Sequence, residues 1–162
     1  MRNAQFCPLC IIILLLAGCA SGPDFPSLKN QLTPKAAAAN SANEHPIIWG
    51  GVIINATNLA TTTRLEILAY PLDKKHHPKT SEDAEGRFFV EKKGYLETAD
   101  YATSRHITVH GQIISIEKGK VGEADYDFPL VKATKLFLWP RPSQQTDSDS
   151  RIHFGFGVIL SN

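Results

Sequence analysis

The 162-residue sequence has few cysteines and no excess of charge of either sign. Three cysteines cannot form the dense disulfide framework of a small stapled fold. The 17 basic and 16 acidic side chains give a net charge of +1, without the basic excess typical of nucleic-acid-binding proteins, so we expect no nucleic-acid partner. No nucleotide-type glycine loop and no G-x-S-x-G motif is present. Hydrophobic residues make up 43%, which excludes a wholly disordered chain and suits one packed domain.

The longest apolar run lies at the N-terminus and is too short to cross a membrane. Residues 6–17 are twelve apolar residues behind a polar start whose one charged side chain is Arg2. A helix of that length spans about 18 Å, well short of the roughly 30 Å hydrocarbon core of a bilayer. We therefore predict that residues 1–18 are a secretory signal peptide rather than a transmembrane helix.

The run ends in Leu16, Ala17, Gly18 and Cys19, a motif that resembles the lipobox of bacterial lipoproteins. The resemblance implies cleavage between Gly18 and Cys19 and lipidation of Cys19, whose acyl chains would hold the protein in a membrane. Ala20 stands where an aspartate would resemble an inner-membrane retention signal, so we expect the outer membrane, with the domain facing the periplasm. An ordinary signal peptide with a chance cysteine is the alternative, and exposure at the cell surface stays open.

Beyond the signal peptide, composition divides the chain into three parts. Residues 19–45 have weak apolar periodicity and many Pro, Ala, Asn and Ser, which predicts a lipidated N-terminus and a flexible tether. A short alanine-rich helix over 35–43 is the alternative. Residues 46–140 carry the strand patterns of one β-domain. Residues 141–162 form a polar linker and an apolar, glycine-rich C-terminal tail, for which an edge strand, a membrane-touching tail and an unpaired end all stay open.

Five segments of the domain have β-branched runs or alternating apolar residues. Gly50 and Gly51 predict a bulge or a barrel corner, and the apolar phase slips at Ile113 and Ile114, which predicts a second bulge. Five strands with a helix after the third match the element order of an OB-fold. The expected fold is all-β with one short helix, a small five- to six-stranded OB-like β-barrel behind a flexible N-terminal tether. The expected strands cover residues 47–55, 62–72, 86–91, 105–118 and 126–139, the last with a possible split near Pro129, and the expected helix covers 94–102.

The domain also contains a series of short motifs in a fixed order: 50–53 (GGVI), 65–68 (LEIL), 70–73 (YPLD), 86–88 (GRF), 94–97 (GYLE), 105–111 (RHITVHG), 126–129 (YDFP) and 138–139 (LW). Together with the lipobox, this series resembles the Slp family, the starvation-inducible outer-membrane lipoproteins of Gram-negative bacteria. The resemblance implies a lipid-anchored protein linked to stationary phase and envelope stress, and it transfers no catalytic residue. Relatives often carry a longer aromatic C-terminal tail, of which residues 154–157 (FGFG) would be a shortened counterpart.

The histidines do not form an obvious metal site in the sequence. His106 and His110 are four positions apart, but on a strand their Cα atoms lie about 13 Å apart, so one ion cannot bind both. His76 and His77 belong to a charged loop with Asp73, where a weak surface metal site is the alternative to a solvated loop. We predict no metal and no cofactor.

No catalytic group stands out either. The carboxylates of residues 82–85 and 123–125 lie in polar segments, whereas general acid catalysis needs a carboxyl whose pKa is raised by burial or by a neighbour. Cys7 and Cys10 would leave with the signal peptide and Cys19 would carry lipid, so no cysteine nucleophile remains. We therefore predict no catalytic residue and no enzymatic activity.

These observations favour an outer-membrane lipoprotein of the Slp type with a structural or interaction role in cell-envelope maintenance or stress response. Its expected partners are the outer membrane, through the acyl chains on Cys19, and an envelope protein or polymer that the sequence does not identify. The alternative is a periplasm-facing binding module whose small barrel holds a lipid, glycan or metal ligand. An enzyme is the third hypothesis, and it predicts convergent polar groups with strongly shifted pKa values.

Overall fold

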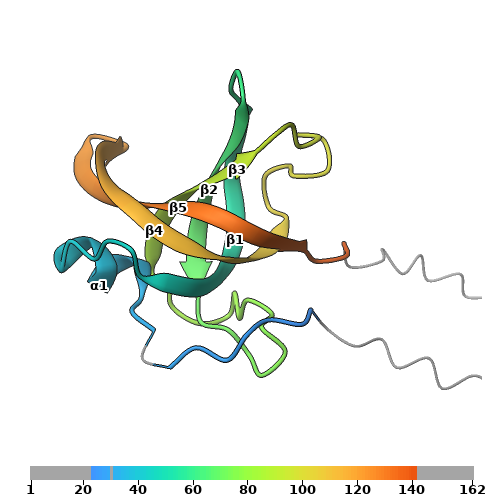
Figure 1. Ribbon diagram of the computed structural model, residues 1–162, viewed down its shortest axis with the longest axis horizontal. Helices are drawn as coiled ribbons and strands as arrows, with labels where there is room; N and C mark the ends of the chain where they lie inside the picture. Colours follow the sequence, from blue (N-terminus) through green and yellow to red (C-terminus); the bar gives the residue numbers. More distant parts are fainter. Residues whose placement is uncertain (1–22, 30, 142–162) are drawn as a thin grey trace, which may run out of the picture.

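Five β-strands form a closed barrel in the part of the chain that the computed structural model describes, residues 23–29 and 31–141. Around the barrel the strands follow the order β1-β2-β3-β5-β4, and β4 pairs with β1 to close the sheet (Figure 1). This architecture confirms the expected all-β fold with one short helix. In chain order the elements are α1 (Pro34–Ala39), β1 (Pro46–Asn58), β2 (Thr62–Tyr70), β3 (Gly86–Lys93), β4 (His106–Val121) and β5 (Ala124–Leu138).

The strand pairing is mixed. Neighbouring strands are antiparallel except β3 and β5, which run parallel where residues 89–91 pair with 130–132. Five strands in this order give the OB-like barrel that the element order predicts. The sequence leaves a sixth strand open in the C-terminal tail, and residues 142–162 lie outside the described part.

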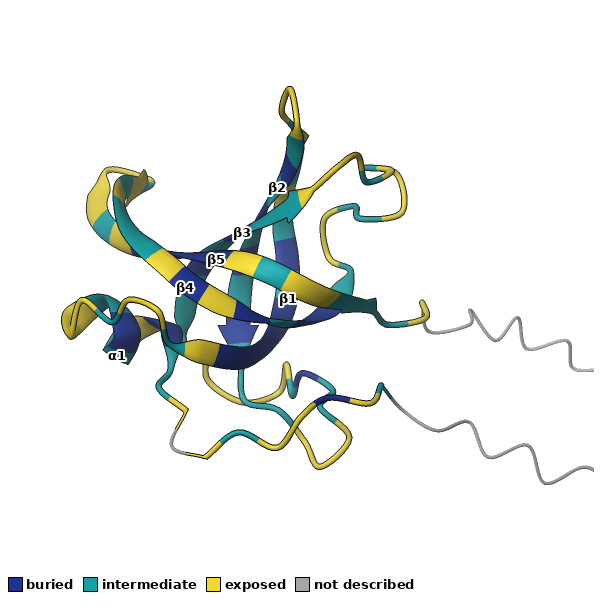
Figure 2. Ribbon diagram, viewed as in Figure 1, coloured by how far each residue is buried: buried dark blue, intermediate teal, exposed yellow. Residues whose placement is uncertain are grey.

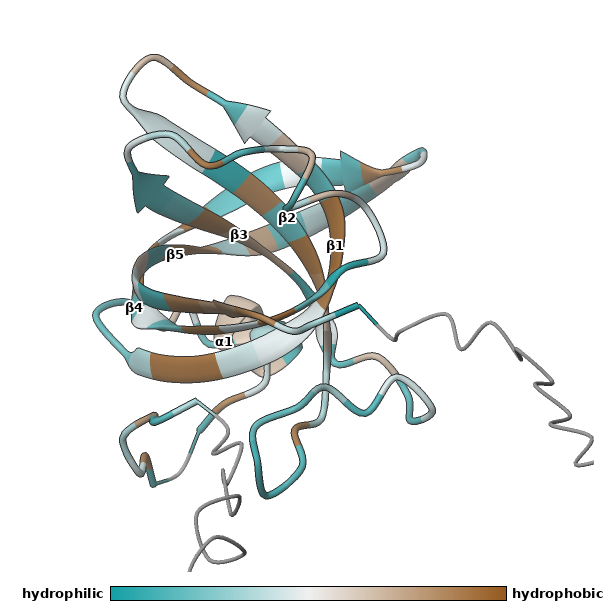
Figure 3. Ribbon diagram, turned by 90° about the vertical axis from the view of Figure 1, so that its right-hand side faces the viewer, coloured by the Kyte–Doolittle hydropathy of each residue, from teal (hydrophilic) through white to brown (hydrophobic). Residues whose placement is uncertain are grey.

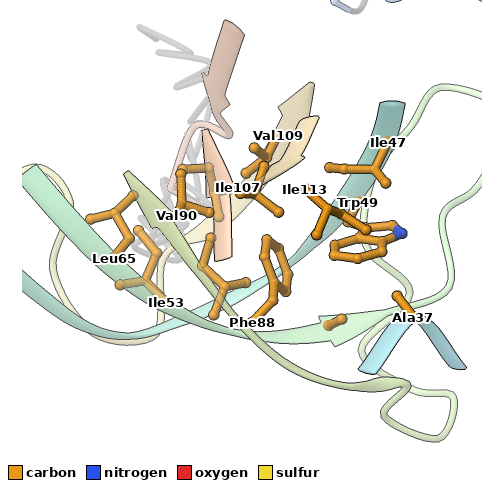
Figure 4. Packing of buried hydrophobic residues seen from close by; sticks show 13 residues of the cluster. Ala37, Ile47, Trp49, Ile53, Leu65, Phe88, Val90, Ile107, Val109 and Ile113 are labelled. Atoms are coloured by element: carbon orange, nitrogen blue, oxygen red, sulfur yellow. The ribbon is translucent and has the colours of Figure 1, made fainter. Parts of the chain in front are cut away.

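The core fills the inside of the barrel because each strand alternates between inward and outward side chains. On β2 the burial pattern alternates without a break, with Thr63, Leu65, Ile67 and Ala69 inside. Figure 2 shows buried residues along the strands and exposed residues at the hairpin tips. The Trp49 and Phe88 rings meet edge to face in the interior, with centroids 5.1 Å apart (Figure 4).

The glycine pair in β1 lies where this strand changes partners. Residues 46–52 pair with β4 and residues 50–58 pair with β2, so Gly50 and Gly51 pair with both neighbours. A Cβ atom at Gly51 would lie only 1.9 Å from the carbonyl oxygen of Leu68, so the backbones approach more closely than any side chain permits. The pair therefore forms the barrel corner that the sequence predicts. The bulge of this strand lies farther on, between Ile53 and Asn55.

The bulge expected in β4 is confirmed at the predicted place. The register with β5 shifts between Ile113 and Ser115, which leaves Ile114 as the extra residue, 43% exposed. The buried alternation up to Ile113 then resumes at Ile116, which packs against the core. The partner strand β5 is continuous through the buried Pro129, so the possible split there is not observed.

The helix expected over residues 94–102 is not formed. This segment is a loop whose one regular feature is a turn, in which the carbonyl oxygen of Glu97 accepts the N–H groups of Asp100 and Tyr101. A turn this short does not repay the cost of helix nucleation. Tertiary contacts hold the loop instead, because the backbone N–H of Leu96 donates to the Thr63 hydroxyl at 2.9 Å.

The described helix lies before the barrel, in the segment that the sequence assigns to a tether. Pro34 occupies its first turn, and the Thr33 hydroxyl caps it by accepting the N–H of Ala36 at 3.2 Å. Ala37 is fully buried and belongs to the hydrophobic core (Figure 4). The alternative expectation of a short alanine-rich helix over 35–43 thus describes this segment better than a flexible tether.

Two hydrogen bonds fix the chain just before this helix to the barrel. The indole N–H of Trp49 donates to the carbonyl oxygen of Leu32 at 2.7 Å, and the N–H of Ile48 donates to the side-chain oxygen of Gln31 at 2.6 Å. The expectation of a flexible tether over 19–45 is therefore wrong for residues 31–45. The sequence gives no sign of this docking, because the two partners lie in β1.

Candidate functional site

The loop between β2 and β3, residues 71–85, closes one end of the barrel and is organised by Asp73. The Asp73 carboxylate accepts the backbone N–H groups of Lys75 at 2.7 Å and His77 at 2.9 Å. These hydrogen bonds, that of His77 foremost, hold the pKa of the Asp73 carboxyl below its usual value. The turn forces His76 into a left-handed conformation with φ of +64°. As a result, two adjacent histidines are presented in different directions.

His77 faces His106 on β4 and Trp139 beyond the end of β5. The ring centroids lie 5.2 Å from His106 and 4.6 Å from Trp139, and the Nε2 atom of His77 lies 3.4 Å from Nδ1 of His106. Burial, and then the electrostatic effect of the neighbouring His77, lower the pKa of His106. The sequence cannot show this cluster, because its members come from three separate segments.

Thr108 joins this cluster to the loop. Its buried hydroxyl donates to the carbonyl oxygen of His76 at 2.7 Å and accepts the indole N–H of Trp139 at 3.0 Å. The Thr108 hydroxyl thereby hydrogen-bonds both the loop and the residue after β5. These two bonds explain how a polar side chain can be fully buried here.

The structure separates the histidines that the sequence places together. The ring of His76 packs edge-on against Phe25, with centroids 5.4 Å apart, whereas His77 packs against His106. Among residues 23–29 and 31–141, no three His, Cys, Asp or Glu side chains gather as a group that could hold a metal ion.

The first described residues form an N-terminal strap, residues 23–29, that lies against this loop. Phe25 is only 9% exposed, and its ring lies 5.2 Å from the Lys135 ammonium group on β5. Lys135 also donates to the carbonyl oxygen of Asp24 at 2.5 Å. The strap and the hydrophilic loop lie below the barrel in both views (Figures 1 and 3).

A wide hollow opens at the edge of the same end, beside His106. Its volume is about 770 Å³, and Arg105 and Arg141 contribute its charged lining. The Arg105 guanidinium donates to the carbonyl oxygens of Asp100 at 2.8 Å and Trp139 at 2.9 Å. Arg105 thus connects the loop after β3 to the residue after β5, and these hydrogen bonds stabilise the fold.

The carboxylates singled out in the sequence are not assembled into a site. Glu82 forms an ion pair with Lys79 at 2.7 Å on the surface. Burial, and then the charge of Glu82, raise the pKa of Glu85. Residues 123–125 are exposed at the hairpin between β4 and β5.

A different set of charges stabilises the outside of the barrel. Arg64 on β2 pairs with Glu91 on β3 at 2.6 Å and with Glu117 on β4 at 2.9 Å. The guanidinium also lies 5.3 Å from the centre of the Phe89 ring. These half-buried pairs join three strands and so have a structural explanation.

The expected lipidation site lies outside the described residues. Leu16, Ala17, Gly18 and Cys19 precede the strap, and the structure does not describe them. In the described part of the chain, no helix has the length and hydrophobicity needed to span a bilayer.

The fold and this end of the barrel define a small mixed β-barrel domain whose N-terminal strap leads back to a lipobox-like motif. The chain belongs to the outer membrane lipoprotein Slp family, whose family model matches residues 16–156. The protein is therefore an outer membrane lipoprotein. The match begins at Leu16, the first residue of the motif.

Relatives in two bacteria are similar to this chain. The outer membrane protein Slp of Escherichia coli is 28% identical over 151 residues, which cover 90% of this chain and 80% of that protein. The E. coli lipoprotein YeaY is 29% identical over 131 residues, 78% of this chain and 67% of YeaY. A Haemophilus influenzae protein is 40% identical over 91 residues, and the matched part spans about half of that protein, 49%. No solved structure matches the chain.

Proposed function

We infer that this lipoprotein is cleaved between Gly18 and Cys19, is anchored by acyl chains on Cys19, and presents its barrel to the periplasm as a non-enzymatic interaction module. The observation that carries the anchor is the family match, which starts at Leu16 and so includes the whole lipobox. Each buried CH₂ group contributes about 0.8 kcal/mol, so the several acyl chains of a lipoprotein hold it firmly. The proposed role is envelope maintenance or stress response.

The described polar groups support a non-enzymatic role because they build the fold. Thr108 joins the loop to β5, Asp73 organises its own turn, and Arg64 joins three strands. By contrast, several large apolar side chains face solvent and are available for contact with a partner. They are Leu59, Tyr95 and Ile114, which are 48%, 69% and 43% exposed.

The anchor is tested by comparing Cys19→Ser with Cys10→Ser. The second change lies in the signal peptide and is removed with it on cleavage. Metabolic labelling with palmitate should fail for Cys19→Ser alone, and mass spectrometry should find an acylated N-terminal Cys19 in the parent protein and in Cys10→Ser. Palmitate on the Cys19→Ser protein, or a mature protein that keeps residues 1–18, would refute the anchor.

The interaction role is tested by placing a photo-crosslinking residue at Tyr95, Leu59 or Ile114 in growing cells, with Lys118 as an exposed polar control. We expect a discrete adduct with one envelope protein or polymer from at least one apolar position and none from Lys118. If no apolar position gives an adduct, the binding-module hypothesis with a small ligand replaces this one. Protease treatment of intact and permeabilised cells tests the periplasmic orientation, since digestion should require permeabilisation.

A further inference from the structure

The strap allows little free chain between the barrel and the proposed lipid anchor. Lys135 holds Asp24, and Phe25 is packed into the loop end. Five residue steps separate Cys19 from Asp24, and at about 3.3–3.6 Å per residue they reach at most about 18 Å. A lipidated Cys19 therefore keeps this end of the barrel next to the membrane surface, whereas a flexible tether over 19–45 would leave it free.

The surface that this geometry turns towards the membrane is basic. We call it the strap patch. It contains five lysines and two aspartates, and one aspartate, Asp73, already accepts two backbone N–H groups. Lys74 and Lys75 are exposed in its loop. The patch consists of residues 23–29 and 73–79 together with Lys135.

The acidic end of the same loop borders the patch, because Glu82 pairs with Lys79 at 2.7 Å. The carbonyl oxygen of Glu85 accepts the backbone N–H of Lys35 at 3.1 Å, so the last residue of the loop lies beside α1. In Figure 1 the chain enters the described part at the right, whereas α1 and the hairpin between β4 and β5 lie at the left. Along the loop, lysines therefore come first, at 74, 75 and 79, and the acidic residues 82, 83 and 85 follow towards α1.

We propose that the strap patch docks on the phosphate groups of anionic phospholipids in the leaflet that holds the acyl chains. This proposal rests on the proposed lipidation of Cys19. Lys74 and Lys75 supply the contacts to phosphate, and the Phe25–Lys135 contact holds the strap so that the lysines reach the surface. Each lysine near an anionic bilayer shifts the equilibrium between the docked and undocked domain by about 5-fold. Salt screens this attraction.

The test uses the acylated full-length mature protein in vesicles of phosphatidylcholine, with or without phosphatidylglycerol, doped with a headgroup quencher. A fluorophore on Thr80→Cys reports on the strap side, and one on Glu123→Cys reports on the far hairpin. We expect stronger quenching of the Thr80 probe in phosphatidylglycerol vesicles than in phosphatidylcholine alone, and loss of this difference at high salt.

The decisive comparison is Lys74→Gln/Lys75→Gln against Lys118→Gln/Lys120→Gln, which removes the same charge from exposed lysines of the far hairpin. The first pair should lower the docked-to-undocked ratio roughly 25-fold, and the second should leave it unchanged. Equal quenching in both lipids, or equal effects of the two pairs, would overturn the docking while the acyl mass on Cys19 persists. Release from vesicles with no acyl mass would instead overturn the anchor and the docking together.

Discussion

Replacing Gly51 with alanine tests the close approach at the barrel corner. The new Cβ atom would lie 1.9 Å from the carbonyl oxygen of Leu68, where about 3 Å is the shortest tolerable separation. Both groups belong to the backbone, so no side-chain rotation relieves the clash, and β1 must move away from β2 where Gly51 pairs with Ala69. Overpacking costs about 1–3 kcal/mol and each weakened hydrogen bond about 1 kcal/mol, so we expect a loss of about 3 kcal/mol or more.

That loss is large beside the roughly 5–15 kcal/mol by which domains of this size are stable. It corresponds to a melting temperature lower by about 12–24 °C. The measurement is urea unfolding followed by the fluorescence of Trp49 and Trp139, with Gly122→Ala as the matched control. At Gly122 nothing lies within 4 Å and the φ of +61° alone disfavours alanine, at a cost of about 1–2 kcal/mol. If Gly51→Ala destabilises no more than this control, the close-approach argument is wrong.

Three further predictions address the segment just before α1, the histidine cluster and the ion pairs. Trp49→Phe should lose about 1–3 kcal/mol and expose the chain around Leu32 to protease, because the part-buried carbonyl oxygen of Leu32 loses its donor. The pKa of His106 is lower in the folded than in the unfolded state, so the unfolded state binds more protons. The free energy of unfolding should therefore fall as the pH drops below about 6.5. His106→Gln should make the denaturation midpoint less dependent on pH in this range. Arg64→Met should cost about 1–2 kcal/mol, since two half-buried carboxylates lose their partner, and a double-mutant cycle with Glu91→Gln should recover part of it.

Each of these has an outcome that counts against it. Unchanged protease resistance in Trp49→Phe would show that the chain around Leu32 is held by other contacts. An identical pH slope with and without His106 would remove it as the titrating group. Additive losses for Arg64→Met and Glu91→Gln would mean that the ion pair contributes nothing of its own.

The sequence predicts the barrel well because strand patterns are local. The alternation on β2 and the phase slip near Ile113 are both visible in the sequence, and the structure confirms both. The order of five strands also leads to an OB-like barrel. The prediction of a helix over 94–102 is wrong because tertiary contacts hold that segment as a loop. One such contact, from Leu96 to Thr63, leaves no local pattern in the sequence.

The candidate site is less predictable, since it depends on contacts between distant residues. His77 meets His106 and Trp139, and the strap reaches Lys135 through Phe25. None of these pairs has a characteristic spacing in the sequence. An alanine-rich, weakly periodic segment looks flexible until its partners in β1, Ile48 and Trp49, are placed beside it.

The closure of the barrel by β1 and β4 has a consequence for the order of folding. Ile47 pairs with Gly111, so the first strand to leave a translocation channel cannot complete its pairing until the fourth has followed. Non-local pairing of this kind folds slowly, and the unpaired strand is exposed to aggregation in the interval. An apolar β1, with Ile47, Trp49 and Ile53 turned to the eventual core, is therefore the segment that a periplasmic holdase would need to shield during export.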